Sequence, residues 1–177
     1  MNEKLEYNLK NLKLIRLLLK ENSSFLSVNN TVEIYHKGSE VYEALYQDLS
    51  HAKSFIHIQY YLFEDGEVAS RIQSILLDRL ENGVEVSLMV DGIGSRTLSD
   101  DYIDTLRNAG AEVHIFRPVR FPEFTSKINY RNHRKIVVID GEIGFTGGIN
   151  IADKYIHGGG ELGFWRDTHI RIYGDAV

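Results

Sequence analysis

The sequence predicts an α/β sandwich, because strand-like segments alternate along it with segments that have the apolar spacing of helices. Residues suited to ending or capping helices stand between these segments, and 177 residues with 43% hydrophobic content can build the core of one domain. The expected elements begin with a strand and alternate strand and helix: Val32 to Tyr35, Ser39 to Ala52, Phe55 to Tyr61, Val68 to Asn82, Glu85 to Val90, Asp100 to Ala109 and Glu112 to Phe116.

Three residues support the boundaries of these elements. Gly83 and Gly110 each stand just after an expected helix and before a strand, where a residue that tolerates positive φ can end the helix. Ser99 directly precedes the helix that starts at Asp100, and serine is a favoured N-cap. We therefore expect the helix ends to lie close to these positions.

The first 30 residues are expected to form a unit of their own, ahead of a catalytic half-domain over residues 31–177. Leu5 to Lys20 places leucines and Ile15 at helical spacing, with basic residues on the other faces, which predicts an amphipathic lead-in helix. Asn22 to Asn30 is then a polar break. The helix could pack on its own domain or rest on lipid or a partner protein, and the pattern favours neither.

Composition excludes several kinds of chemistry. The chain has no cysteine, so it can form neither disulfides nor thiolate metal sites, and its formal net charge of -5 gives no global attraction to nucleic acid or anionic lipid. No apolar stretch approaches the roughly 18 residues of a membrane-spanning helix, and no signal peptide is visible, so the chain as given is expected to be soluble. An anionic substrate would need a local basic patch.

That patch is expected in the irregular stretch from Arg117 to Arg134. It contains both prolines of the chain, with aromatic residues interleaved among basic ones: Phe121, Phe124, Tyr130, Arg120, Lys127 and Arg131. Ordinary solvated loops carry fewer aromatic residues, so a loop facing substrate or a membrane surface is favoured over a simple connection.

The segment most informative about chemistry is NHRKIVVIDGEIGFTGGIN, residues 132–150. His133, Lys135 and Asp140 follow the pattern H-x-K-x-x-x-x-D, and Lys135 to Ile139 has the composition of a buried strand. Side chains two apart in a strand share a face, so His133 and Lys135 are expected to point the same way. An unprotonated imidazole can attack phosphorus while the ammonium neutralises the phosphate oxygens, which predicts phosphodiester chemistry.

Further residues complete the expected site. Gly147 and Gly148 allow the backbone to approach a phosphate, and Asn150 can donate an amide hydrogen where a short helix, Ile151 to Tyr155, begins. A nucleophilic histidine also needs its far nitrogen held. Asp167 is the candidate, because it opens a strand, Thr168 to Tyr173, after the turn Gly158 to Gly160. Asp140 is the rival, although an aspartate before a glycine is typical of a strand-end turn.

These residues resemble the signature of the phospholipase D superfamily, whose longer form Gly-Gly-x-Asn completes. The flanking segments NYRNHRKIVVIDG, GFTGGINIADKY, GFWRDTHIRI, VDGIGSRTLSD and FIHIQYYLFEDGE are similar to those of bacterial cardiolipin synthases. The resemblance covers roughly Val32 to Val177. It implies a central mixed sheet flanked by helices, forming one half of a pseudo-twofold pair.

The resemblance also implies a mechanism and a set of site residues. His133 would attack the phosphate and form a phosphohistidine, Lys135 and Asn150 would hold the phosphate with Gly147 and Gly148, and Asp167 would orient the histidine. Asp140 completes the motif and counts among the expected catalytic positions. No metal or other cofactor is needed. Donor and acceptor would both be phosphatidylglycerol, glycerol would leave, and the full-length protein would act at the cytoplasmic face of the membrane.

The complete motif occurs once in the chain, whereas the family uses two that face each other. The second is expected from a missing C-terminal domain or from a twofold-related copy. Two other functions therefore stay open: a homodimeric phosphodiesterase or nuclease, for which the aromatic loop is a poor fit and nucleic acid an unlikely partner, and a non-catalytic half that binds phosphate or lipid. The remaining histidines lack metal-ligand spacing, so surface or core roles are expected for them, as for His57. Trp165 is expected in the core.

Overall fold

The computed structural model describes residues 17–20, 27–118, 131–157 and 163–177. They form a mixed sheet of seven strands in the order β1-β7-β6-β5-β2-β3-β4. The strands are β1 (Asn30–Tyr35), β2 (Phe55–Tyr60), β3 (Glu85–Asp91), β4 (Glu112–Phe116), β5 (Ile136–Ile139), β6 (Ile143–Gly147) and β7 (His169–Gly174). The helices are α3 (Gly38–Ser50), α4 (Glu67–Glu81), α5 (Asp100–Asn108) and the short α6 (Lys154–His157).

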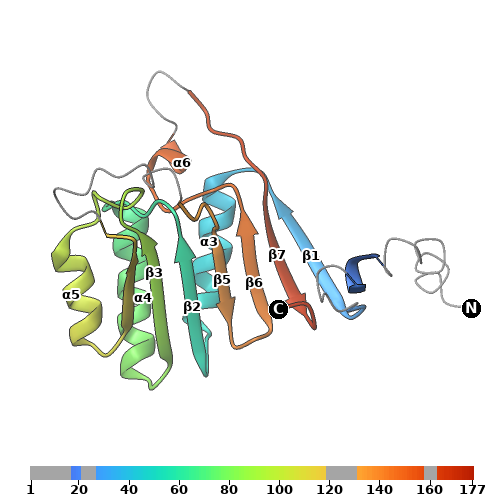
Figure 1. The fold of residues 1–177 in the computed structure, drawn as a ribbon, viewed down its shortest axis with the longest axis horizontal. Coiled ribbons are helices and arrows are strands. Elements are labelled where there is room, and N and C mark those ends of the chain that lie inside the picture. Colours follow the sequence, from blue (N-terminus) through green and yellow to red (C-terminus); the bar gives the residue numbers. More distant parts are fainter. Residues whose placement is uncertain (1–16, 21–26, 119–130, 158–162) are drawn as a thin grey trace, which may run out of the picture.

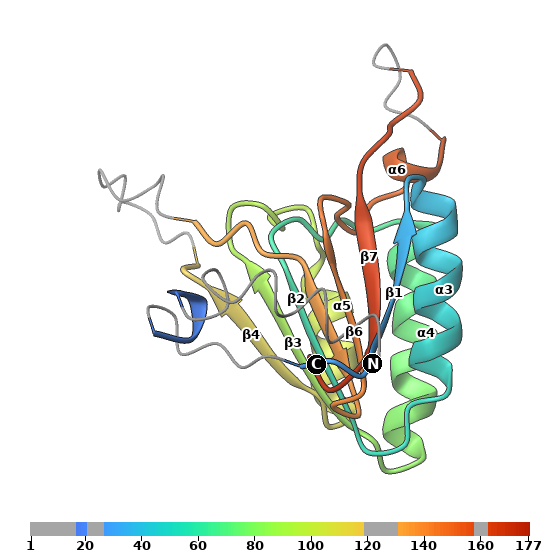
Figure 2. The same cartoon turned by 90° about the vertical axis from the view of Figure 1, so that its right-hand side faces the viewer.

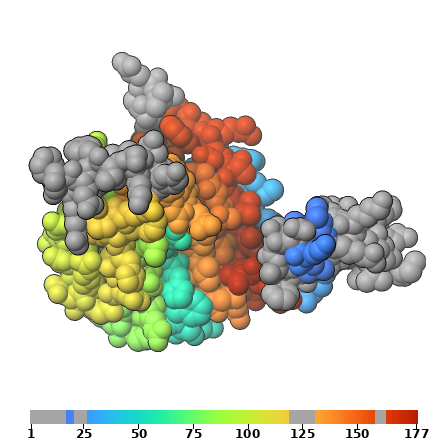
Figure 3. Space-filling view, viewed as in Figure 1, coloured from blue at the N-terminus to red at the C-terminus, as the bar shows by residue number. Residues whose placement is uncertain are grey.

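The helices α3, α4 and α5 lie together on one face of the sheet, as the two ribbon views show (Figures 1 and 2). The space-filling view looks onto the opposite face, where the strands themselves form much of the surface (Figure 3). Strands β2, β3 and β4 run parallel, whereas β5, β6, β7 and β1 pair antiparallel with their neighbours. The sheet is therefore mixed, as predicted.

Alternating apolar residues explain why one sheet face carries the helices. Ile56 and Ile58 of β2 pair with Ile139 and Val137 of β5, and all four are buried. Side chains at alternate strand positions share a face, so these residues form one apolar surface against which the helices pack. Burying it stabilises the fold by roughly 1.5 to 3 kcal/mol for each large aliphatic side chain.

A long-range cap joins the segment after β6 to the helix layer. Helix α4 begins after Gly66, which has no side chain to cap the helix. Instead, the Asp153 carboxylate accepts hydrogen bonds from the backbone N–H groups of Glu67 and Val68, at 2.9 and 3.0 Å. A β-carbon at Gly66 would lie 2.5 Å from that carboxylate. The pairing fixes the chain that follows β6 against α4.

The helix-ending and capping roles predicted for Gly83, Gly110 and Ser99 are confirmed. Gly83 and Gly110 have φ of +81° and +102°, and the Ser99 side chain accepts a hydrogen bond from the backbone N–H of Tyr102. Strand β6 was not predicted, because its sequence IGFTG holds two glycines, which are uncommon inside strands. Helix α6 begins at Lys154, later than the predicted Ile151.

Several predicted features lie outside the described residues. Of the lead-in helix only residues 17–20 are described, and they are helical. Residues 119–130 of the basic and aromatic stretch and the turn Gly158 to Gly160 are not described. Within the described ranges, no helix combines the length and the apolar character needed to cross a bilayer.

Candidate active site at one edge of the sheet

The predicted site residues gather where several strands end at the same edge of the sheet. Ile136, which opens β5, pairs with Gln59 near the end of β2 and with Thr146 near the end of β6. Gly147, the last residue of β6, pairs with His169, the first of β7. In Figure 1 this edge is the upper one, on the side of α6. Segments far apart in the sequence therefore converge here.

His133 and Lys135 meet at this edge, just before β5 begins. The ammonium of Lys135 donates a hydrogen bond to the backbone carbonyl of His133 at 2.7 Å. The His133 side chain is exposed, and its ring stacks on that of Tyr61, with centroids 3.7 Å apart and planes 18° apart. The imidazole is thus open to solvent on one side and supported on the other.

Lys135 is half-buried, with its charge near a carboxylate and an aromatic ring. Burial lowers the pKa of its ammonium, and the charge of Asp167 opposes that shift. The ammonium lies 5.7 Å from the centroid of the Tyr61 ring. A cation partly removed from water interacts more strongly with phosphate oxygens than a fully solvated one.

Asp167 lies beside the glycines that end β6. A β-carbon on Gly148 would come within 2.0 Å of the Asp167 carboxylate, so only glycine leaves room for that carboxylate. One Asp167 oxygen accepts a hydrogen bond from the backbone N–H of Thr168 at 2.7 Å. Within the part of the chain that is described, the Asp167 carboxylate makes no hydrogen bond to the His133 ring. Its role in orienting that ring stays a prediction.

His169 is a buried histidine of this edge that the sequence did not single out. Its side chain has no exposed surface, and neither ring nitrogen has a hydrogen-bond partner among the described residues. Burial lowers its pKa to about 4, Asp167 acts in the opposite sense, and Lys135 lowers it further. A β-carbon on Gly147 would lie 2.6 Å from the His169 ring, so this glycine too is required by close packing.

Asn150 is buried, and its side chain is engaged with neighbouring protein groups. Its amide donates to the Tyr155 hydroxyl at 2.8 Å, and its side-chain oxygen accepts from the Leu62 backbone N–H at 3.3 Å. The Tyr42 hydroxyl donates to its backbone carbonyl at 2.6 Å. The second amide hydrogen has no acceptor among the described residues, so it could bind a phosphate, and the predicted phosphate contact stays a prediction.

Asp140 lies at the opposite end of β5 from His133 and Lys135. Its carboxylate accepts three backbone hydrogen bonds, from Lys53 at 2.9 Å, Ser54 at 2.8 Å and Phe55 at 3.0 Å. Partial burial opposes ionisation, but the N–H groups of Phe55, Lys53 and Ser54 together hold the pKa of this carboxyl below its usual value. This geometry fits the strand-end turn, with the carboxylate engaged by backbone donors, and a catalytic role for Asp140 stays a prediction.

The same end of the sheet has a second His-x-Lys pair, His51 and Lys53, in the connection between α3 and β2. It lacks the following aspartate, since Ile58 stands at that place. His51 ends α3, and Lys53 uses its backbone N–H to bind Asp140. This pair therefore belongs to the structural end of the sheet.

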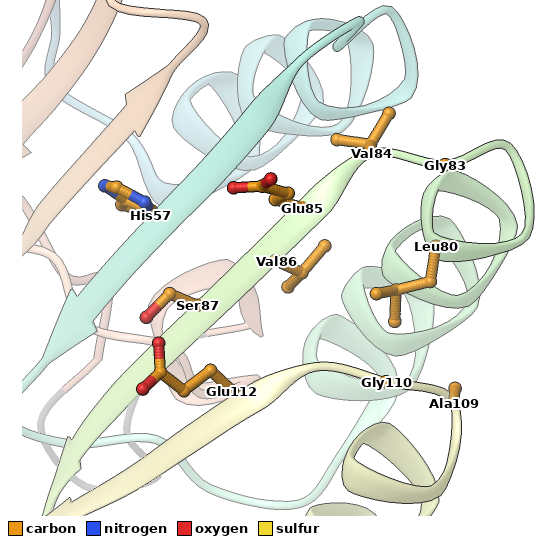
Figure 4. A pocket seen from close by; sticks show the side chains of 10 residues that line it. All are labelled: His57, Leu80, Gly83, Val84, Glu85, Val86, Ser87, Ala109, Gly110 and Glu112. Carbon is orange, nitrogen blue, oxygen red and sulfur yellow. The ribbon is translucent and has the colours of Figure 1, made fainter.

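Other candidate residues lie away from the site or under it. His57 is exposed, and it lines a hollow of about 400 Å³ with residues of β3, β4 and the ends of α4 and α5, among them Glu85, Glu112 and Leu80, as Figure 4 shows. Its ring contacts Phe55, at 4.7 Å between centroids. Trp165 is partly buried and packs edge-on against Tyr155, at 5.2 Å. Neither residue shares a hydrogen bond or a ring contact with His133.

Comparisons with known proteins agree with this geometry. The family described as "Cardiolipin synthase, PLD-like domain" matches residues 45–170. Cardiolipin synthases of Staphylococcus aureus strain Mu50 and of Oceanobacillus iheyensis are each 43% identical over 164 residues, which is 93% of this chain and 33% and 34% of the relatives. The chain thus spans about a third of the length of these relatives.

Solved structures share the fold at lower identity. Nuc from Salmonella typhimurium, a phospholipase D family member, superposes with a TM-score of 0.57 at 16% identity, covering 84% of this chain and 86% of that one. NucT from Helicobacter pylori gives 0.59 at 17% identity, covering 84% and 87%. Phosphatidylserine synthase of Haemophilus influenzae gives 0.53 at 14% identity, covering 93% and 41%. These likenesses confirm the predicted fold class.

Proposed function

The chain belongs to the cardiolipin synthase family of PLD-like domains, and on that premise we propose that it supplies one half of a phosphatidyltransferase active site, with His133 as the nucleophile. The observation that carries the proposal is the meeting, at one sheet edge, of an exposed imidazole and a half-buried ammonium. Attack on phosphorus needs the first group, and the charged phosphate oxygens need the second.

The substrate we propose is phosphatidylglycerol. A ring nitrogen of His133 attacks phosphorus, a P–N bond forms, and the P–O bond to glycerol breaks. Glycerol leaves with that electron pair and takes a proton from a general acid. The hydroxyl of a second phosphatidylglycerol then gives up its proton and attacks phosphorus, the P–N bond breaks, and cardiolipin and free His133 result. Lys135 neutralises the phosphate oxygens in both steps.

The general acid is expected from a second motif outside this chain. His133 cannot serve, because in an in-line displacement it occupies the side opposite the leaving oxygen. His169 is buried, and its pKa of about 4 makes it neutral and without an acidic proton to give at pH 7. A positioned acid contributes 100-fold or more. We therefore propose that the rest of a longer protein, or a second copy, completes the site at the membrane surface.

A diester with an activated leaving group tests the nucleophile without the second motif. Bis(4-nitrophenyl) phosphate releases 4-nitrophenolate, which is stable as an anion at neutral pH and needs no general acid. The chain should release one equivalent in a burst and gain the mass of a nitrophenyl phosphoryl group. His133→Gln should show neither, whereas His57→Gln, which removes an exposed histidine on the helix-free face, should show both. Absence of the adduct on the unchanged chain would overturn the proposal.

A homodimeric phosphodiesterase is the alternative that one observation favours. Nuc and NucT are covered over 86% and 87% of their length by a match to this single-motif chain. Light scattering combined with a turnover assay on a phosphodiester separates the two. An active dimer supports the alternative. Cardiolipin formation from phosphatidylglycerol vesicles only when a second motif is supplied supports the transferase.

A further inference from the structure

We infer that Tyr61 is a further member of the active site, an aromatic platform that holds the His133 ring for attack and stabilises the positive charge of the phosphohistidine. The inference rests on the proposed function for its chemistry, but the contact itself stands on geometry. The His133 and Tyr61 rings are stacked at 3.7 Å, and the Lys135 ammonium lies 5.7 Å from the same Tyr61 ring. One aromatic ring thus contacts the nucleophile and lies near the phosphate clamp.

The backbone holds this platform in place from the neighbouring strand. Tyr61 directly follows β2, and its carbonyl accepts a hydrogen bond from the Ser95 hydroxyl at 3.0 Å. The same hydroxyl accepts the backbone N–H of Phe63 at 3.0 Å. Ser95 therefore ties together the chain on both sides of Leu62. Because Ser95 is buried, water does not compete for these bonds.

Gly94 lets the loop after β3 press against Tyr61. A β-carbon at Gly94 would lie 2.2 Å from the Tyr61 carbonyl oxygen and 3.0 Å from an edge carbon of its ring. The Asp91 carboxylate accepts the backbone N–H groups of Ile93 and Gly94, at 2.8 and 3.0 Å, which sets the shape of this loop. The segment VDGIGS, which the catalytic scheme above does not use, thus has a function in positioning Tyr61.

Asp91 also reaches the nucleophile's own segment. Arg131, two residues before His133, places its guanidinium 3.5 Å from the Asp91 carboxylate and donates to the backbone carbonyl of Arg117 at 2.8 Å. The loop after β3 therefore supports the stack from both sides, through Tyr61 on one and Arg131 on the other. Contacts with the loop after β3 thus hold Tyr61 directly and His133 through its neighbour Arg131.

The platform acts when charge develops on the imidazole. Attack on phosphorus makes the ring cationic, and the negative face of a tyrosine ring attracts a cation that lies over it. The neutral imidazole before attack carries no net charge, so the attraction of the tyrosine ring increases as positive charge develops in the transition state. This lowers the barrier to attack. Cation–π contacts of this kind correspond to roughly 2-fold to 30-fold in rate.

Ring-current shifts in the NMR spectrum test the contact without any reaction. A ring stacked under His133 moves the His133 ring-proton signals upfield, and those signals are identified as the ones lost in His133→Gln. Tyr61→Leu should move them downfield, and Tyr61→Phe should leave them nearly in place. Tyr173→Leu, which removes an exposed tyrosine of β7, is the matched control and should not change them. Unmoved signals in Tyr61→Leu would overturn the platform.

The burst with bis(4-nitrophenyl) phosphate tests the chemical role. Tyr61→Leu should slow adduct formation by about 2-fold to 30-fold at unchanged chain fold, as checked by circular dichroism, and Tyr61→Phe should keep the native rate. Gly94→Ala leaves the ring itself intact but displaces Tyr61, so it should slow the burst as well. Equal rates in all forms would refute the charge-stabilising role, and a slow Tyr61→Phe would assign the effect to the hydroxyl instead of the ring face.

The two readouts separate this inference from the proposed function. If the ring-current shifts are as expected but no form of the chain gives an adduct, the stack of Tyr61 on His133 is supported and the proposed phosphohistidine is overturned. If Tyr61→Leu forms the adduct and leaves the His133 signals at their native shifts, the result supports His133 as the nucleophile and overturns the aromatic platform.

Discussion

The two ends of strand β5 carry residues of one motif in opposite chemical states. At the amino end, the His133 side chain is exposed and stacks on the Tyr61 ring, and the half-buried Lys135 ammonium donates to the His133 carbonyl. At the carboxyl end, the Asp140 carboxylate is saturated by three backbone N–H groups. Under the proposed function, the difference teaches that the motif divides into two residues for chemistry and one for holding the strand in place.

The division has a simple physical reason. A group that stabilises a transition state must keep hydrogen-bonding or charge capacity free for the substrate, whereas a group that stabilises the fold does so by using that capacity within the protein. Asp140 has φ of +55°, a conformation that aspartate tolerates better than most residues. It is therefore suited to the turn before Gly141.

The largest effect is expected at the chemical end. Lys135→Ala should slow the nitrophenolate burst by about 100-fold to 1,000-fold, because it removes the charge that neutralises the phosphate oxygens. The thermal unfolding midpoint should stay close to that of the unchanged chain. Stopped-flow absorbance and a melting curve measure the two. A rate within a few-fold of native would show that Lys135 is not the phosphate clamp.

Removal of Asp140 should give the converse result. Asp140→Ala should lower the free energy of unfolding by about 2 to 3 kcal/mol, since it leaves backbone donors of the turn without their acceptor. Asp140→Asn keeps one acceptor oxygen and should lose about half as much. The burst rate of folded protein should be unchanged in both. Denaturant titration and the burst assay test this. A slow burst in a fully folded Asp140→Asn would contradict the purely structural role and support a catalytic one for Asp140.

The buried His169 predicts a pH dependence of stability. Its pKa in the fold is lowered to about 4, whereas an unfolded histidine titrates near 6.5. Below pH 6.5, His169 binds a proton in the unfolded chain but stays neutral in the folded one. The free energy of unfolding therefore decreases as the pH falls from 6.5 toward 4. The unfolding free energy should be about 2 kcal/mol lower at pH 5 than at pH 8 from this residue.

His169→Leu is the comparison that isolates this contribution. Only the difference in slope between the two proteins is read, because other groups titrate in the same range. Equal slopes would show that His169 is protonated in the fold, for example through the neighbouring Asp167 carboxylate. Chemical denaturation at several pH values supplies the data.

The smallest effect is expected for the second His-x-Lys pair. Lys53→Ala removes an exposed side chain but keeps the backbone N–H that binds Asp140. Stability should stay within about 0.5 kcal/mol, and the burst should be native. Set beside Lys135→Ala in the same assays, this variant shows whether position in the sheet, and not the His-x-Lys pattern, decides function.

The alternation of strands and helices was predictable because apolar spacing reports directly on which face of each element is buried. His133 and Lys135 were predictable for a related reason, since their pattern is local in the sequence. Strand β6 was missed because glycines conceal its strand character; Gly147 makes room for His169 of β7, and Gly144 lies against Val177. The burial of His169 depends on β7 lying between β1 and β6, which local patterns do not determine. The stack of Tyr61 on His133 was not predicted either, because it depends on β2 pairing with β5, which local patterns also do not determine.

The strand order also determines when the candidate site can form during synthesis of the chain. Strands β2, β3 and β4 can assemble from neighbouring stretches of chain, but β1 pairs with β7, which emerges last of the seven, and β7 also brings Asp167 and His169 to the edge. Contacts between residues so distant in sequence form slowly. On the ribosome, therefore, His133 is synthesised before Asp167 and His169, which lie at the same edge of the sheet. The candidate site is complete only when β7 has paired with β1 and β6.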